Sequence, residues 1–482
     1  MKFEGTHTAI AIWVFGVLAA VTIGPAFVSV LVTRMERYSL PFGAILGIIF
    51  AIVWVYGSGK YWWLLFPVMA FWGGLFWVGF RIYPDELGLV ITMAALAVAL
   101  CTHNQAIVQD RSPASWGFLL LGLYFLAHLL VSLSNSRLGW LSGGGSIVRA
   151  YASGITCLIF SWMYYKFGSS EHIKLVVIIL FVVMFVRIVI SMLTFYTPAL
   201  FGISGAGFLW LYSSTDLRFS ALYQMLFGIM LFYLFEGRWT KAIIIVFIIS
   251  MFILVLFGEG RVSVAMAVST LILWMLLARK TILLVYLLPL LIVCIVLVHS
   301  EVHLLSQLPP GVQRAMSFIP GLNSQLIYNT GVSDDWHFDL LLLGYQRWTS
   351  SFASLIFGNC ISPEGVYSFY SLDYFSKLEI AAGTSRYECT LWTVLATLGI
   401  IGTALYVWIF TFLFRDIIPI VRREGIISFD HAVYAAAIIS LLLMILFGWI
   451  RGGFPGIEMM LGVMAKALYE DSKREMLVLK SN

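Results

Sequence analysis

Charged side chains are scarce in this chain. Asp, Glu, Lys and Arg make up 11% of its 482 residues, whereas 61% are hydrophobic and the mean hydropathy is +0.96. A soluble domain is closer to a quarter charged and half apolar, so this composition excludes an ordinary soluble protein. Most of the basic residues behind the net charge of +5 follow membrane topology rather than forming a nucleic-acid surface. We therefore expect no nucleic-acid partner.

Cysteine is also rare, and several other signals are lacking. None of the five cysteines shows C-x-x-C spacing. Only Cys360 and Cys389 are expected outside the membrane, so one disulfide is allowed but not indicated. The first apolar run, Thr8 to Val32, is too long for a cleavable signal peptide and lacks a clear cleavage site. The chain also contains no internal repeat and no low-complexity tract.

Long apolar runs recur from one end of the chain to the other. Most are long enough to cross about 30 Å of hydrocarbon, but those at 40–56 and 86–101 are short, and a re-entrant or tilted segment is an alternative for one of them. We expect an all-α fold, a polytopic transmembrane helical bundle of about 12–14 helices with one large outer loop that contains short helices. The expected spans are 9–32, 40–56, 62–80, 86–101, 116–134, 147–165, 173–195, 219–236, 240–257, 262–278, 282–299, 388–412, 431–450 and 454–469.

One long polar interval separates two apolar blocks. It divides the chain into an N-terminal transmembrane bundle (1–299), a large loop (300–386) and C-terminal transmembrane helices with a cytoplasmic tail (387–482). Polar groups of a membrane-filling chain gather at a water-accessible end, so we expect the function at this loop and at the helix ends that face it.

Basic residues near the helix ends predict the orientation. Cytoplasmic loops are enriched in Lys and Arg, so we expect both termini inside and the large loop outside. Arg34, Arg37, Arg81 and Arg137 fall on the outer side and oppose this assignment. The residues that support it are Lys60, Arg111, Lys166, Arg238, Lys241, Arg279, Lys280, Arg415, Arg422, Arg423, Lys473, Arg474 and Lys480.

A second group of arginines lies on the outer side, several of them at helix ends. They either extend to lipid headgroups or form an anion site, because guanidinium groups bind phosphate oxygens bidentately. A polyprenyl diphosphate would present such an anion. Arg187 lies within an expected span, where both a structural ion pair and a functional role are open. The outer residues are Arg149, Arg218, Arg261, Arg314, Arg386 and Arg451.

The large loop contains two expected helices. VQRAMSF, with Arg314 on its polar side, follows LPPG and is predicted to lie along the membrane surface. SDDWHFDLLLLGYQRW is predicted to form a helix capped by Ser333 or Asp334, with Trp336, Leu340 and Leu343 on one face. His337 in this helix is either a structural or a catalytic residue.

Glu388 follows Arg386 and Tyr387 at the outer end of a long apolar span. Two interpretations are open. The carboxylate either pairs with Arg386 at the helix start or acts as a general base on an acceptor hydroxyl. The second role requires burial to raise its pKa towards neutrality.

Several ordered motifs between about Arg149 and Gly402 resemble those of a known family. They are DLRFSALYQ at a helix start, GEGRVSVAMAVSTLIL, VQRAMSFIPG, DDWHFDLLLLGYQRW followed by IFGNCIS, and YECTLWTVLATLGIIG. Together they resemble the O-antigen ligase and O-antigen polymerase superfamily of bacterial envelope glycosyltransferases. In this resemblance, the family's arginine before its middle helix corresponds to Arg218. Its Ser-x-Ser-Arg-like helix start corresponds to Gly258 to Arg261, and its Tyr-His-Asn stretch to Tyr387, Glu388 and Cys389.

The resemblance implies a GT-C-like, metal-independent, inverting glycosyltransferase without a cofactor in the bacterial inner membrane, with the large loop periplasmic. It implies transfer of a glycan from an undecaprenyl-diphosphate-linked donor, among membrane lipids, to a lipid A-core or another glycan acceptor. Ligase and polymerase differ only in that acceptor. Residues matching Arg218 and Arg261 would hold the diphosphate. We expect catalysis by Glu388 and Arg261 and substrate binding by Arg218, Arg261, Arg314, Arg386, His337 and Tyr387.

The chain departs from the family at two positions. Glu388 replaces the usual histidine, and the Trp-Arg of the loop helix reads Trp336-His337. A glutamate can serve as a base, while a catalytically diverged paralogue is an alternative. A flippase or transporter of lipid-linked sugars is another. A transporter would more often show two repeated halves and broken helices. We identify no repeat in this chain and little intramembrane charge beyond Arg187.

Overall fold

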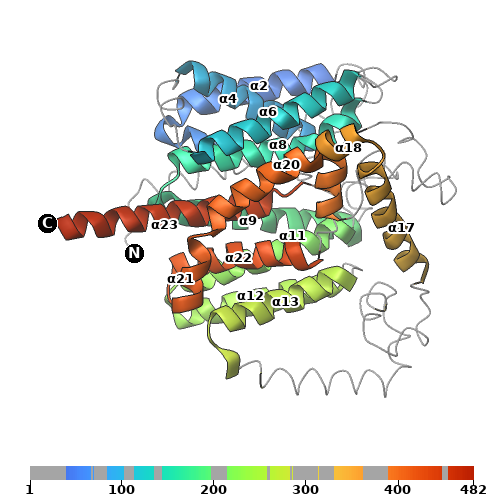
Figure 1. The fold of residues 1–482 in the computed structure, drawn as a ribbon. Coiled ribbons are helices and arrows are strands. Elements are labelled where there is room, and N and C mark those ends of the chain that lie inside the picture. Colours follow the sequence, from blue (N-terminus) through green and yellow to red (C-terminus); the bar gives the residue numbers. More distant parts are fainter. Residues whose placement is uncertain are drawn as a thin grey trace.

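The protein is all-α and polytopic in a computed structural model (Figure 1). The description covers residues 39–66, 69, 84–102, 113–134, 144–196, 214–257, 261–282, 285, 313, 331–361, 389–447 and 454–481. The expected spans 9–32 and most of 282–299 lie outside these residues. Helices account for nearly all of the described chain, which confirms the predicted fold class.

The helices match the expected apolar spans closely. The short spans 40–56 and 86–101 correspond to the 19-residue helices α2 and α4, which pack against each other. The span expected at 62–80 begins in the 3-10 helix η1 (Gly59–Leu64). The helices that correspond to expected spans are α2 (Ser39–Gly57), α4 (Pro84–Thr102), α6 (Pro113–Ser134), α8 (Gly144–Phe167), α9 (Ser170–Tyr196), α11 (Ser214–Leu234), α12 (Arg238–Phe257), α13 (Arg261–Leu277), α20 (Thr390–Phe414), α22 (Phe429–Phe447) and α23 (Ile457–Ser481).

The long helices run side by side, and short helices mark the two ends of the bundle (Figure 1). Helices α17 (Gly331–Trp348) and α18 (Phe352–Phe357) lie at one end, which we call the loop end. Helix α21 (Ile417–Glu424) lies at the other, the α21 end, where α23 extends beyond its neighbours (Figure 1). Helix α23 therefore continues well past the expected limit at residue 469.

Four helices in the described part of the chain are long and apolar enough to cross a membrane. They span Ser115–Ser134, Arg238–Val255, Thr390–Phe414 and Phe429–Phe447. At 1.5 Å per residue, 20 helical residues extend about 30 Å. These helices identify the chain as a multi-pass membrane protein.

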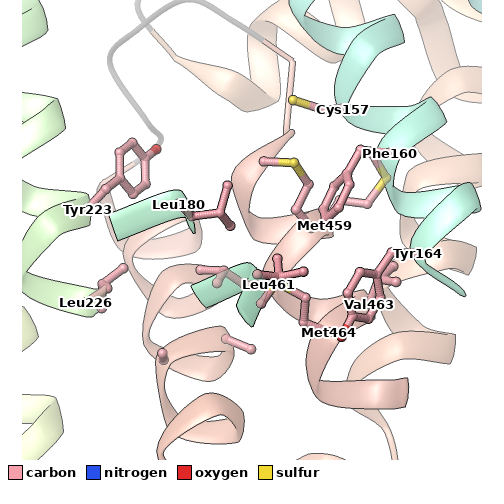
Figure 2. Packing of buried hydrophobic residues seen from close by; sticks show 14 of the residues in the cluster. Cys157, Phe160, Tyr164, Leu180, Tyr223, Leu226, Met459, Leu461, Val463 and Met464 are labelled. Carbon is pink, nitrogen blue, oxygen red and sulfur yellow. The ribbon is translucent and has the colours of Figure 1, made fainter. Parts of the chain in front are cut away.

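The centre of the bundle is packed with apolar and aromatic side chains. Figure 2 shows Met459 and Met464 of α23 lying among side chains of α8, α9 and α11. Phe160 and Tyr164 from α8 are fully buried there. Sequence-distant helices therefore share one core, with α23 at its centre.

At the α21 end, charged side chains join α23 to its neighbours. Lys466 of α23 is only 4% exposed, and its ammonium pairs with the carboxylate of Asp416, which precedes α21. Glu470 lies 3.7 Å from the same ammonium. Asp471 accepts a 2.8 Å hydrogen bond from the backbone N–H of Ser170 at the start of α9. The buried lysine thus has two carboxylate partners, which a buried charge requires.

Candidate functional site

Arg218 and Arg261 lie at the loop ends of two neighbouring helices. Arg218 lies in the second turn of α11, and Arg261 is the first residue of α13. The two helices contact each other and both run from the loop end to the α21 end. The structure describes the backbone of these arginines and not their side chains.

A ring contact near the other end sets the relative depth of the two arginines. The rings of Phe232 in α11 and Trp274 in α13 are 5.9 Å apart. Phe232 follows Arg218 by 14 residues, and Trp274 follows Arg261 by 13. With a rise of 1.5 Å per residue, both arginines lie about 20 Å along the axis from this contact. The backbones of Arg218 and Arg261 therefore lie at nearly the same level along the bundle axis, which is what we call the same depth.

The described part of the large loop is docked on the first half of α20. The Trp392 ring of α20 lies 5.9 Å from Tyr345 and 6.0 Å from Trp348, both in α17. The Trp348 indole N–H donates a 3.2 Å hydrogen bond to the carbonyl of Leu355 in α18. Aromatic packing thus joins the loop helices to each other and to the bundle.

Asn359 completes this docking with hydrogen bonds on three sides. Its backbone N–H donates to the Ala396 carbonyl of α20 at 2.7 Å. Its side-chain amide donates to the Arg347 carbonyl at 2.7 Å and accepts from the Ser354 hydroxyl at 2.9 Å. One asparagine therefore connects α17, α18 and α20.

Helix α6 presents a polar stripe to the turn that follows α18. Tyr124, His128 and Ser132 follow one another at intervals of four residues, which places them on one face. The Tyr124 hydroxyl lies 2.9 Å from the carbonyl oxygen of Phe357 and 3.0 Å from that of Leu398, so its single proton is shared between these two acceptors. It thereby bridges the loop to α20 from a third helix.

His128 lies directly beside Tyr124 in this stripe. Their rings are 4.7 Å apart, and His128 is only 7% exposed. Its imidazole contacts the Phe357 carbonyl, while its Nδ1 has no hydrogen-bond partner in the described structure. A neutral imidazole donates through one nitrogen and accepts through the other, so one acceptor position here is left open.

The Cys360 thiol closes the same cluster. Burial raises the pKa of this thiol, and a hydrogen bond to Ser132 partly offsets the increase. The Ser132 hydroxyl also lies 3.2 Å from that of Tyr151 in α8. A buried thiol with a raised pKa is a poor nucleophile. The cluster is suited to holding the loop in place, and we assign no chemistry to Cys360.

The structure places the other predicted site residues only in part. His337 is half-buried beside the α17 face formed by Trp336, Leu340 and Leu343, and the prediction of that face is confirmed. The predicted cap at Ser333 or Asp334 is wrong, because α17 begins earlier, at Gly331.

The remaining predicted site residues, Arg314, Arg386, Tyr387 and Glu388, lie outside the described residues. Glu388 immediately precedes Cys389, the N-cap residue of α20. Cys360 and Cys389 are both free thiols, so the disulfide that the sequence allowed is not formed.

No known protein family has a model that matches this chain, and no curated protein matches it. Within the described residues, no group of three or more His, Cys, Asp or Glu side chains could hold a metal ion.

Sequence reasoning missed two sets of buried polar residues. The first is the α6 stripe, which its four-residue spacing within an apolar helix could have identified. The second is in α23, where Glu458 is 3% exposed and its Oε1 has no hydrogen-bond partner in the described structure. Lys466 is buried in the same helix. Glu458 and Lys466 are thus two buried charged side chains of the described bundle that the sequence analysis did not single out.

Proposed function

We propose that the protein transfers a glycan from an undecaprenyl-diphosphate carrier to an acceptor hydroxyl at the periplasmic face of the bacterial inner membrane, as an O-antigen ligase-like or polymerase-like glycosyltransferase. The observation that supports this is the equal depth of Arg218 and Arg261 on neighbouring helices at the loop end. In this proposal the loop end is periplasmic, and the α21 end with both termini is cytoplasmic.

The proposed reaction depends on electrostatics and positioning. The acceptor oxygen forms a bond to the anomeric carbon as the carbon–oxygen bond to the diphosphate breaks. The diphosphate leaves with the bonding electrons, and Arg218 and Arg261 stabilise its developing charge. Glu388 takes the proton of the acceptor hydroxyl. The docked unit of α17 and α18 holds the large loop beside this end and positions the acceptor.

A reconstituted assay tests the proposal. The purified full chain is incubated in vesicles with an undecaprenyl-diphosphate-linked oligosaccharide and a lipid A-core or carrier-linked acceptor. Release of undecaprenyl diphosphate together with a longer acceptor supports transfer. Intact donor that has only changed leaflet contradicts transfer and supports transport.

Transport of lipid-linked sugars is the second candidate, and Glu458 favours it. Ionisable residues inside membrane helices often serve proton relays or substrate paths, and Tyr406 of α20 lies close enough to Glu458 to interact with it electrostatically. A Glu458→Gln variant distinguishes the two candidates. Transport coupled through this carboxyl would be lost in the variant, whereas transfer through the arginines at the ends of α11 and α13 would persist.

A further inference from the structure

Two lysine side chains at the α21 end converge on a single aromatic ring. The ammonium of Lys241, in the first turn of α12, lies 5.4 Å from the ring centroid of Phe232. The ammonium of Lys280, just beyond α13, lies 5.9 Å from the same centroid. Both distances are within cation–π range. Neither ammonium has an ion-pair partner among the described residues.

The backbone holds Lys280 in this position. The N–H of Lys280 bonds the Met275 carbonyl at 2.9 Å, and that of Arg279 bonds the Leu276 carbonyl at 3.1 Å. This pair of bonds is a Schellman motif, with Arg279 in the left-handed conformation at φ 55°. The motif turns the chain sharply after α13, so that Lys280 is directed towards Phe232 in α11.

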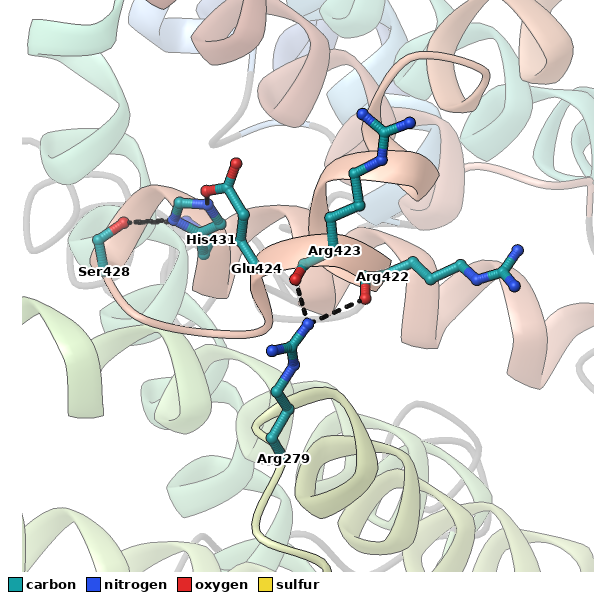
Figure 3. A network of polar contacts seen from close by, with 6 residues as sticks. All are labelled: Arg279, Arg422, Arg423, Glu424, Ser428 and His431. Carbon is teal, nitrogen blue, oxygen red and sulfur yellow. Dashed lines mark hydrogen bonds and ion pairs between the residues drawn. The ribbon is translucent and has the colours of Figure 1, made fainter.

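The side chain of Arg279 secures the turn against α21. Its guanidinium donates to the carbonyls of Arg422 and Arg423, two of the last carbonyls of α21 (Figure 3). Figure 3 also shows Glu424 directed to His431, away from the arginine. Glu424, the acidic residue of α21, is therefore paired with His431 and forms no ion pair with the lysines.

Lys241 is held from the other side. Its backbone N–H bonds the Gly237 carbonyl at 2.9 Å across the short connection between α11 and α12. Arg238 begins the same helix, so a second cation lies within one turn. Glu236 belongs to this connection but forms no ion pair with either lysine. Like charges held together with no ion-paired acid among the described residues leave a local positive potential that an anion would relieve.

Exposed apolar side chains lie within two residues of these cations in sequence. Trp239 is 86% exposed, and Ile243 follows one turn further into α12, also exposed. Ile282 is exposed just beyond Lys280. Tryptophan is enriched at membrane interfaces, where one part of its ring meets headgroups and the other meets acyl chains. Trp239 and Ile243 lie on the side of α12 opposite to Lys241, so this side of the helix is the apolar one, and Ile282 is the exposed apolar residue next to the lysine pair in sequence.

We propose that Lys241 and Lys280 bind the phosphate of an anionic glycerophospholipid at the α21 end, with its acyl chains running along the apolar part of the bundle beside Ile282. Each ammonium has three N–H donors, and one phosphodiester can accept from both. The lipid bridges the start of α12 and the end of α13 next to α11. This site is independent of the proposed glycan transfer, because it lies at the opposite end of the bundle.

The test measures thermal unfolding of the purified full chain in mixed micelles. Phosphatidylglycerol is expected to raise the midpoint by roughly 2–5 °C relative to phosphatidylcholine. The double variant Lys241→Gln/Lys280→Gln should lose most of this difference, and Lys241→Arg/Lys280→Arg should keep it. The matched control Lys174→Gln, which removes an exposed charge from α9, should respond like the wild type.

Three outcomes would overturn the proposal. The first is a wild type that does not distinguish the two lipids. The second is a double glutamine variant that keeps the full difference. The third is equal stabilisation by inorganic phosphate, since the acyl chains of the lipid would then have no role. If the glutamine variant has a lower midpoint in phosphatidylcholine as well, its phosphatidylglycerol-specific difference remains the deciding measurement.

Discussion

Gly358 and Gly399 bring two backbone segments into direct contact. A Cβ on Gly358 would lie 2.5 Å from the Gly399 nitrogen, and a Cβ on Gly399 would lie 2.5 Å from the Gly358 nitrogen. Both residues have positive φ, 79° and 62°. Gly399 also bends α20 within its length. The loop is thus joined to the bundle where no side chain fits, and α20 divides into a half that carries the loop and a half that continues through the core.

We expect Gly399→Ala to weaken the docking of α17 and α18. The substitution combines a strained φ, which costs about 1–3 kcal/mol, with overlap against backbone atoms of the turn after α18. Thermal unfolding in detergent should show a clear fall in the midpoint. Gly57→Ala is the control, because a Cβ there meets nothing within 4 Å. Equal midpoints for the two variants would contradict the proposed joint.

Arg261→Ala, and less strongly Arg218→Ala, should abolish glycan transfer while folding is retained. Loss of donors to a leaving diphosphate is expected to reduce the rate by roughly 10²–10³-fold. Lysine at either position keeps the charge but not the bidentate geometry, so partial activity is expected. Turnover of undecaprenyl-diphosphate donor is the measurement, with Arg474→Ala, an exposed arginine of α23, as control. Normal turnover in both alanine variants would reject the diphosphate site.

Glu388→Gln tests the proposed base separately. The variant keeps the shape and polarity of the side chain but cannot accept a proton, so the rate should fall by roughly 10²–10⁴-fold. Donor binding should be unchanged, because the arginines are intact. Single-turnover transfer and donor affinity measured on the same sample separate these effects. Full activity would assign Glu388 a structural role at the start of α20.

Substitutions at Arg279 separate two contributions to the free energy of unfolding, the strain of its left-handed backbone and the hydrogen bonds of its guanidinium. Arg279→Gly relieves the left-handed conformation but loses the bonds to the Arg422 and Arg423 carbonyls. Arg279→Ala loses the bonds and keeps the strain. Alanine should therefore be less stable than glycine by about 1 kcal/mol. Denaturant titration of both variants measures the difference, and an equally or more stable alanine variant would argue against the assigned conformation.

Asp416 should make the bundle sensitive to acid. A hydrogen bond from Lys466 is the main cause that lowers the pKa of this carboxyl. Its contribution is therefore complete above the unfolded value of about 3.9 and is lost as pH falls through the lowered pKa. At neutral pH, Asp416→Asn should cost about 2–4 kcal/mol, because Lys466 stays buried with Glu470 as its remaining partner.

Stability measured against pH checks the assignment of Asp416. The difference between wild type and Asp416→Asn should shrink as the solution is acidified through that range. The double variant Asp416→Asn/Lys466→Met should recover part of the loss, because it also removes the buried charge. A difference that is constant with pH would mean that Asp416 does not titrate against Lys466.

The positions of the helices could be predicted from the sequence because each apolar run is local. The run at 116–134 corresponds to α6, and the run at 431–450 to α22. The face of α17 formed by Trp336, Leu340 and Leu343 was predictable for the same reason, since helical spacing alone places them together. The polar start of α17 was assigned wrongly, because a capping residue is hard to distinguish from an acid inside the first turn.

The candidate site could be predicted only as a set of residue types. The sequence identifies Arg218 and Arg261 as outer arginines, but their equal depth depends on the contact of Phe232 with Trp274 between helices. The four-residue spacing could have identified the α6 stripe, but the sequence does not show which side chains cover His128 or Glu458, because those neighbours are distant in the chain.

Composition and the length of its apolar runs by themselves determined that this protein is a multi-pass helical bundle, since hydrocarbon requires each run to satisfy its own backbone hydrogen bonds. Tertiary structure alone decided that Gly358 meets Gly399, that Lys241 and Lys280 share one ring, and that Lys466 finds two carboxylates. Gly358 and Gly399, like Lys466 and Asp416, are far apart in the chain, and the energies of all these contacts depend on how the helices pack, which no local pattern encodes.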